Sequence, residues 1–214
     1  MSEWRPIYTD PAEIEAKSFE TIACEMGPRD FDAMTDLVVR RVIHATADFD
    51  YADNLCFSPD AVAWGVEALR GGAEVVTDTT MVAAGINKRV LTSLGGTVHT
   101  FIADADVAEE ARRRGATRSA VSMEKAARLT GPLVYAIGNA PTALVRIHEL
   151  LRAGEMPMPE LVIGVPVGFV NVVESKELIM TSASRHIVAR GRKGGSTVAA
   201  AIVNALLYMA ISHA

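Results

Sequence analysis

Arg41 and His44 have the residue types and the spacing for proton transfer beside a cation. They are three residues apart near the end of a predicted helix, so their side chains share one face and lie about one turn apart. An imidazole can give and take a proton near neutral pH, and a guanidinium can hold an anionic group. Leu37 belongs to the apolar stripe and lies seven residues before His44, so we expect the imidazole to be partly buried. On pattern alone, a histidine bonded to a carbonyl oxygen at the core edge is the commoner interpretation.

Residues 190–196 are the strongest candidate for an anion site. This segment follows a predicted strand, opens a helix and carries three glycines and three cations. Free N–H groups at a helix N-terminus and arginine side chains suit a carboxylate or a phosphate. The GxxxxGK[ST] spacing of a P-loop is absent, and a tight turn with solvated cations fits the motif equally well. The residues concerned are the cations Arg190, Arg192 and Lys193 and the N–H donors Gly194, Gly195 and Ser196.

Three further polar residues are candidates with a plain structural alternative. Ser18 interrupts the apolar stripe between Ile14 and Ile22, where its hydroxyl binds a ligand or, more commonly, the carbonyl four residues earlier. Arg118 precedes a helical stretch and is either an anion clamp or a surface arginine. Asp78 ends a predicted strand and is the carboxylate to consider, although aspartate there often caps the next helix.

The cysteines and the remaining histidines show no metal-ligand spacing, since neither HxH nor HExxH occurs. We therefore expect no metal held by the protein. Cys24 and Cys56 are far apart, which predicts two buried thiols in a reducing compartment. The scattered histidines are His99, His148, His186 and His213.

The composition argues against several classes of protein. Of 214 residues, 50% are hydrophobic and 22% are charged, which predicts one folded domain over residues 1–214 rather than a disordered chain. A net charge of -5 and 6% aromatics argue against a nucleic-acid binder. The first ten residues contain no apolar signal core, and the apolar run 198–211 is interrupted by Asn204 and shorter than about 18 residues. We expect a cytoplasmic protein that does not enter the membrane.

The elements that must position these residues are helices in the first third and alternating strands and helices after it. Predicted helices begin at Asp10, Asp30 and Ser58, and the first and third end at Gly27 and Gly71. Five β-prone runs follow, which predicts an α/β fold with a mostly parallel five-stranded sheet covered by helices on both faces. Ligands of such sheets bind beyond the carboxyl ends of the strands. The runs are 74–77, 97–102, 133–137, 161–165 and 186–189, and the helical segments are 79–87, 104–114, 142–153, 171–180 and 196–213.

The last predicted helix is apolar nearly all round. Such a helix must be buried on several sides, either in the core of its own chain or against a twofold partner.

Ordered motifs over almost the whole chain resemble the precorrin-8X methylmutase family, which includes the cobalt-precorrin-8 enzymes. Each motif is weak alone, but their joint order is specific. They are residues 14–19 (IEAKSF), 39–44 (VRRVIH), 57–60 (FSPD), 78–86 (DTTMVAAGI), 117–120 (TRSA), 136–144 (AIGNAPTAL), 164–170 (GVPVGFV), 174–177 (ESKE) and 191–196 (GRKGGS).

The resemblance implies an isomerase that shifts a methyl group between neighbouring carbons on ring C of a tetrapyrrole in cobalamin biosynthesis. It implies that His44 donates and accepts a proton, and that no redox cofactor or group donor takes part. Any cobalt would be carried by the substrate. The residues implied to contact the substrate are Ser18, Arg41, Arg118, Arg192, Gly194, Gly195 and Ser196, with Asp78, Met81, Gly85, Ile86 and Asn139 as further candidates.

The resemblance also implies a dimer with an active site near the subunit interface. This favours a partner chain against the last helix and a product that stays bound. Residues 44–52 look closer to the cobalt-dependent branch, although nothing in their chemistry senses cobalt. Two alternatives stay open on the residues alone. A nucleotide-dependent transferase or dehydrogenase would bind no coloured ligand, and a non-catalytic corrinoid carrier would lose no turnover when His44 is replaced.

Overall fold

The structure is a computed structural model that describes residues 7–212, so His213 lies outside the described part. Six strands form one sheet in the order β1-β6-β5-β4-β2-β3. The pairs among β2 to β6 are parallel, and only β1 pairs in the antiparallel sense, with β6. The strands are β1 (Leu55–Phe57), β2 (Glu74–Thr77), β3 (Val98–Thr100), β4 (Leu133–Ile137), β5 (Leu161–Gly164) and β6 (His186–Ala189).

The five predicted strands are confirmed, but the predicted strand number was wrong by one. The additional strand, β1, is three residues long and too short to show an alternating pattern. It is held at the sheet edge by β6, where Leu55 pairs with Ala189. The mostly helical first third of the chain therefore also supplies an edge strand.

The helices include every segment predicted as helical. The second helix begins after the cap Asp32 rather than Asp30, and the third after Asp60 rather than Ser58. The helices are α1 (Pro11–Met26), α2 (Ala33–Thr46), α3 (Tyr51–Asn54), α4 (Ala61–Arg70), α5 (Thr80–Gly85), α6 (Lys88–Ser93), α7 (Ala105–Arg114), α8 (Arg118–Ala126), α9 (Pro141–Ala153), α10 (Val172–Met180) and α11 (Ser196–Ser212).

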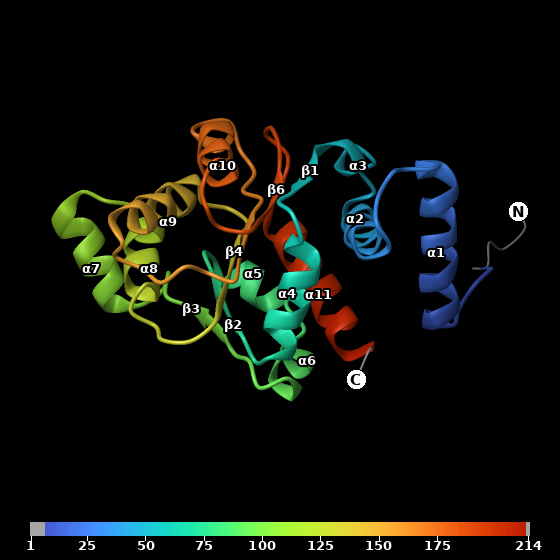
Figure 1. Cartoon of the computed structure of the whole chain (residues 1–214), viewed down its shortest axis with the longest axis horizontal. Helices are drawn as coiled ribbons and strands as arrows, with labels where there is room; N and C mark the ends of the chain where they lie inside the picture. Colours follow the sequence, from blue (N-terminus) through green and yellow to red (C-terminus); the bar gives the residue numbers. More distant parts are fainter. Residues whose placement is uncertain (1–6, 213–214) are drawn as a thin grey trace, which may run out of the picture.

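Helices cover both faces of the sheet, as predicted (Figure 1). Along β4, Val134 and Ala136 pack into the core with α2, α4 and α11, while Leu133, Tyr135 and Ile137 pack into the core with α8, α9 and α10. This alternation follows from the twofold repeat of a strand, and its apolar residues on both faces are typical of a parallel sheet.

The last helix, α11, is buried by its own chain. Its buried residues run from Val198 to Ala210, and it packs against α2, α4 and α5 as well as β4 and β5. The prediction that a partner chain covers this helix was wrong, because α2 and α4 lie where that partner would be needed. Among residues 7–212, no helix is long and apolar enough to cross a membrane.

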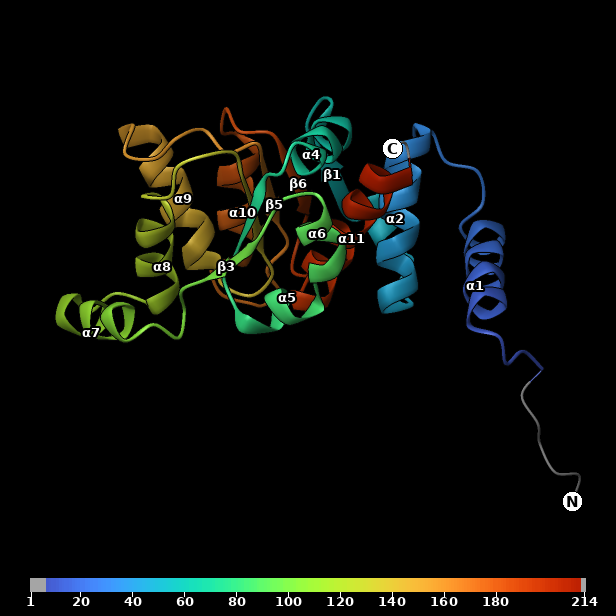
Figure 2. The ribbon, with the colours of Figure 1, turned by 90° about the horizontal axis from the view of Figure 1, so that it is seen from below.

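The first helix, α1, lies farthest from the sheet, beyond α2 (Figure 2). Its N-terminus is capped by Asp10, whose carboxylate accepts the N–H groups of Ala12 and Glu13. Its buried residues are Ile22 and Met26, and α2 is the element it contacts most. One long side of α1 and the neighbouring side of α2 are therefore exposed to solvent.

Candidate active site

Arg41 and His44 of α2 lie against the same aromatic ring, that of Phe19 in α1. The imidazole stacks on it with 5.1 Å between ring centroids, and the Arg41 guanidinium carbon lies 4.6 Å from the ring centroid. The predicted shared face of Arg41 and His44 is confirmed. Phe19 was not predicted as a site residue, although it lies in the motif 14–19 next to Ser18.

Arg41 is anchored by three groups. Its Nη1 donates to Glu15 Oε1 at 2.6 Å, and its guanidinium lies 5.2 Å from the ring centroid of Tyr208 in α11 as well as over Phe19. The side chain is thus held between α1 and α11 with an acidic partner on one side. Glu15 must share this cation with any anionic ligand.

A hollow of about 460 Å³, here named the His44 hollow, opens between α1 and α2. His44 is exposed in it, so the expectation of a partly buried imidazole was wrong. The reason is the position of Leu37, which is 49% exposed and lies on the outer side of α2 with His44. Ser18 also lines the hollow, and its hydroxyl donates to the Ile14 carbonyl at 2.8 Å, the local bond expected from its position in the helix, while its oxygen can still accept from a ligand.

A second hollow of about 450 Å³, here named the Arg41 hollow, lies between α2, α5 and α11. It brings together Arg41, Met81, Gly85 and Ser196, which are far apart in the sequence. Met81 is 69% exposed there. A Cβ on Gly85 would lie 2.7 Å from the Cβ of Ala200, so α5 approaches α11 at a distance that only glycine allows.

Asn204 lines the Arg41 hollow and was not predicted as a site residue. Its amide donates to the Gly85 carbonyl at 2.8 Å and accepts the Asn87 N–H at 2.8 Å, which ties the end of α5 to α11. The signal in the sequence was its position as the polar interruption of an apolar helix.

Asp78 lies at the carboxyl end of β2 but does not face a ligand. Its side chain is fully buried and accepts the backbone N–H groups of Gly138, Asn139 and Ala140 at 3.0, 2.8 and 2.7 Å. Burial raises the pKa of this carboxyl, while the three N–H donors act in the opposite direction. The expectation of a ligand-facing carboxylate was wrong, and Asp78 instead holds the β4–α9 turn, on which Asn139 is exposed.

The turn from β6 to α11 approaches both the β4 and the β5 ends. A Cβ on Gly138 would lie 2.8 Å from the Ser196 Cα, and one on Gly194 would clash with the Val165 carbonyl oxygen. The Gly195 N–H donates to that Val165 carbonyl at 2.8 Å. The prediction that Gly195 offers a free N–H donor was therefore wrong. Within the described part of the chain, the N–H groups of Gly194 and Ser196 have no hydrogen-bond acceptor.

The cations of this turn have different roles. Lys193 donates to Asp48 and Asp50 at 2.6 Å each, and these bonds raise its pKa. The Lys193 ammonium is therefore already paired with two carboxylates. Arg192 is exposed and its guanidinium lies 5.6 Å from the ring centroid of Phe169. Of the two, Arg192 is the one available to a ligand.

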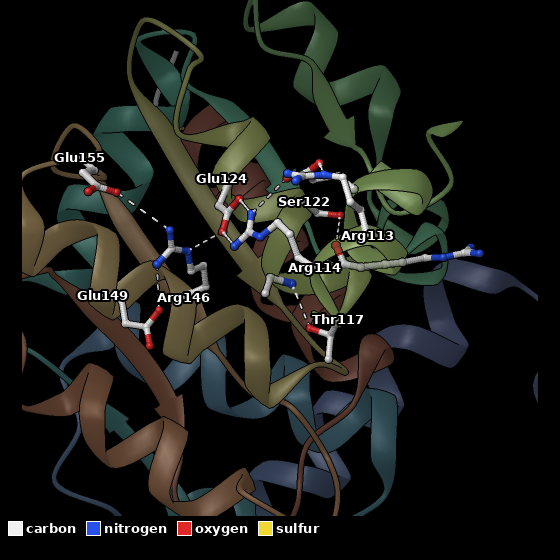
Figure 3. Close-up of polar contacts among 11 residues, drawn as sticks. Arg113, Arg114, Thr117, Ser122, Glu124, Arg146, Glu149 and Glu155 are labelled. Atoms are coloured by element: carbon white, nitrogen blue, oxygen red, sulfur yellow. Dashed lines mark hydrogen bonds and ion pairs between the residues drawn. The ribbon is translucent and has the colours of Figure 1, made fainter. Parts of the chain in front are cut away.

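Arg118 is exposed at the start of α8, after the cap Thr117. The Thr117 hydroxyl donates to Thr142 Oγ1 at 2.9 Å, which places Arg118 at the same sheet edge as the β4–α9 turn. Farther along α8, Glu124 belongs to a charged network in which it bridges Arg114 and Arg146 (Figure 3). The hollow of about 560 Å³ beside this network contains none of the predicted site residues.

Two other expectations are corrected by burial. Ile86 is buried in the core under α5 and does not face either hollow. Cys24 is exposed and Cys56 half-buried, so the prediction of two buried thiols was wrong. In residues 7–212, no group of three His, Cys, Asp or Glu side chains is placed to hold a metal ion.

Comparison with known proteins identifies the group to which this fold and site belong. The family model described as precorrin-8X methylmutase (CbiC) matches residues 13–209. The cobalt-precorrin-8 methylmutase of Priestia megaterium is 44% identical over 211 residues, covering 99% of this chain and 93% of that protein. The precorrin-8X methylmutase of Pseudomonas aeruginosa is 42% identical over 199 residues, covering 92% and 95%.

A solved structure agrees with the sequence matches. The precorrin-8x methyl mutase of Thermus thermophilus superimposes with a TM-score of 0.86 and 38% identity, covering 94% of this chain and 98% of that one. Its similarity extends over the sheet and the helices on both faces. On the family model, the relatives and the fold together, the chain belongs to the precorrin-8X methylmutase family.

Proposed function

We propose that this methylmutase, an isomerase of cobalamin biosynthesis, shifts a methyl group on ring C of precorrin-8 or its cobalt form and uses His44 for proton transfer. The observation that carries the proposal is the exposed imidazole of His44, stacked on Phe19 beside the Arg41 guanidinium. An exposed imidazole can reach a bound ring, and the stack restricts its orientation. Proton transfer from it to the macrocycle lets the conjugation rearrange, and the same imidazole takes a proton back when the methyl group has moved.

The substrate lies across both hollows in this proposal. The His44 hollow and the Arg41 hollow are about 460 and 450 Å³, and the Phe19 ring contacts His44, which lines the first, and Arg41, which lines the second. A tetrapyrrole is larger than either hollow and flat, so its apolar face would cover Phe19. Its peripheral carboxylates would meet cations on the surrounding elements, and charge-assisted hydrogen bonds of this kind fix orientation.

The carboxylate contacts are assigned to Arg41, Arg192 and Arg118 and to the N–H groups of Gly194 and Ser196. Arg192 is favoured because it is exposed, and the two N–H groups because they have no acceptor within residues 7–212. Ser18, Met81 and Asn139 contribute contacts along the ring edge. No redox cofactor or group donor is needed for an intramolecular shift.

The partner that completes the site is a second copy of this chain. Ile14 of α1, which lines the His44 hollow, and Leu37 of α2 are both exposed apolar side chains. Spacing puts Leu37, Arg41 and His44 on one face of α2. A twofold contact on this face would cover the apolar side chains and close the hollow over the ring. The product would then leave slowly.

The cobalt form is the preferred substrate in this proposal. The support is that the relatives from Priestia megaterium and Salmonella typhimurium, 44% and 45% identical, are named cobalt-precorrin-8 methylmutase. The test is to offer precorrin-8 and cobalt-precorrin-8 separately and to compare kcat/KM from the visible spectrum. A higher kcat/KM with the metal-free ring would reverse the assignment.

The role of His44 is tested by His44→Ala in the same assay. Loss of general acid–base help lowers the rate on the order of 100- to 10,000-fold while binding is kept. His148→Ala is the matched control, because His148 lies in α9 on the other face of the sheet. Near-normal turnover by His44→Ala would remove His44 from the mechanism. Binding without turnover by the wild type would indicate the corrinoid carrier instead.

A further inference from the structure

Lys176 of α10 is a buried cation without a carboxylate partner among the described residues. Its side chain is 0% exposed, and its Nζ donates to two backbone carbonyls, those of Gly191 at 2.7 Å and Lys193 at 2.8 Å. A buried charge is costly unless hydrogen bonds compensate for the lost water. Both carbonyls belong to the turn that carries Arg192, so Lys176 fixes the backbone of that turn.

Three consecutive carbonyls of this turn accept hydrogen bonds from other groups of the protein. Those of Gly191 and Lys193 accept from Lys176, and the one between them, on Arg192, accepts the Gly168 N–H at 3.2 Å. Successive peptide dipoles turned in this way leave N–H groups on the opposite side, where they favour an anion. The Gly194 N–H belongs to the same peptide group as the Lys193 carbonyl, and the Ser196 N–H follows two residues later.

The same turn is tied on its other side to the segment behind His44. The Lys193 side chain donates to Asp48 and Asp50, which lie just after the end of α2. Lys176 thus holds the backbone of the turn, and Lys193 holds the turn to the end of the helix that carries His44.

We propose that Lys176 is a positioning residue for substrate carboxylates: its ammonium holds the carbonyls of Gly191 and Lys193 inward, so that Arg192 and the Gly194 and Ser196 N–H groups face the ligand. The proposal rests on the proposed function, since it takes the turn as the carboxylate site. Lys176 itself does not touch the substrate, because it is fully buried.

The test replaces Lys176 by methionine, which keeps the length and removes the ammonium. We expect KM and the Kd from titration to rise about tenfold, with kcat within about threefold, as for groups coupled in one network. Lys125→Met is the matched control, because Lys125 pairs with Asp104 and Asp106 and makes no hydrogen bond to residues 190–196 within the described part of the chain. Circular dichroism verifies that both variants fold. If Lys176→Met does not fold, Lys176→Gln, which retains a hydrogen-bond donor, is used in its place.

A double-mutant cycle with Arg192→Ala separates positioning from general stability. If Lys176 acts through the turn, Arg192→Ala weakens binding several-fold less in the Lys176→Met background than in the wild type. Additive effects, an unchanged Kd, or a fall in kcat alone would overturn the proposal. The Kd readout does not require turnover, so a wild type that binds but does not isomerise would disprove the function and leave this inference measurable.

Discussion

The imidazole of His44 stacks on the ring of Phe19, with 5.1 Å between the centroids and 18° between the planes. The two residues come from different helices, and α1 has few other contacts with the rest of the chain. The orientation of the proposed acid–base group therefore depends on the docking of α1 against α2.

Replacing Phe19 by leucine should lower kcat about 2- to 10-fold, the scale of one aromatic pair. The physical reason is that leucine fills part of the volume but does not stack on the imidazole. Steady-state kinetics from the visible spectrum provide the measurement. Phe101→Leu is the control, since Phe101 stacks on His99 at 5.9 Å on another part of the molecule. Equal effects of the two changes would show that the Phe19 stack has no special role.

Arg192→Ala should weaken substrate binding by roughly 1.5–3 kcal/mol, the value of a hydrogen bond to a charged group. It should also flatten the salt dependence of the Kd, because exposed ionic contacts are screened over about 8–10 Å at physiological ionic strength. Titration at several salt concentrations measures both. Arg113→Ala, which removes a pair with Glu110, should leave both quantities unchanged. An unaltered Kd and salt slope for Arg192→Ala would place the carboxylates elsewhere.

Asp78→Asn should reduce the free energy of unfolding by about 1–3 kcal/mol. The carboxylate accepts three N–H groups, whereas an amide that keeps its oxygen toward Asn139 and Ala140 turns its NH₂ toward the Gly138 N–H. Urea unfolding measures the change, and Asp106→Asn is the exposed control. No loss of stability would mean that Asp78 is already protonated in the folded protein.

The stability of the wild type relative to Lys176→Met should depend on pH. Burial lowers the pKa of Lys176 from 10.5 to about 8, so between these values the unfolded chain holds a proton that the folded chain has released. Unfolding then takes up a proton, and the free energy of unfolding of the wild type rises with pH across this window. Below pH 8 the difference between the two proteins should be constant.

Urea unfolding from pH 7 to 10.5 checks this slope. Lys125→Met is the control, because hydrogen bonds to Asp104 and Asp106 raise the pKa of Lys125 and move its titration above the window. A flat difference for Lys176→Met would show that its ammonium titrates as in the unfolded chain.

Leu37→Glu should convert the proposed dimer to a monomer. Wild-type protein should scatter light with a mass near twice 22.9 kDa, and the added carboxylate would be buried against the partner's apolar surface. Met158→Glu is the control, since Met158 is similarly exposed but lies away from α1 and α2. A wild-type monomer at micromolar concentration would refute the proposed interface.

Local sequence patterns were enough to predict most helices and strands and to recognise the family. Strand and helix periods repeat within about ten residues, so β2 to β6 and the main helices could be predicted from composition and spacing. The shared face of Arg41 and His44 is also local, because three residues are close to one helical turn. The order of the motifs along the chain was likewise visible without a structure.

Only the tertiary structure decided which of the candidate groups are free. Lys193 and Arg192 are neighbouring cations in sequence, yet one is bound by Asp48 and Asp50 from more than 140 residues away and the other is exposed. Asp78 turned out to hold a turn, and Lys176 showed no signal beyond its motif. The physical reason is that a charge or an apolar residue has the same local pattern whether it is paired, buried or exposed. Its partners come from segments that only the winding of the sheet brings together.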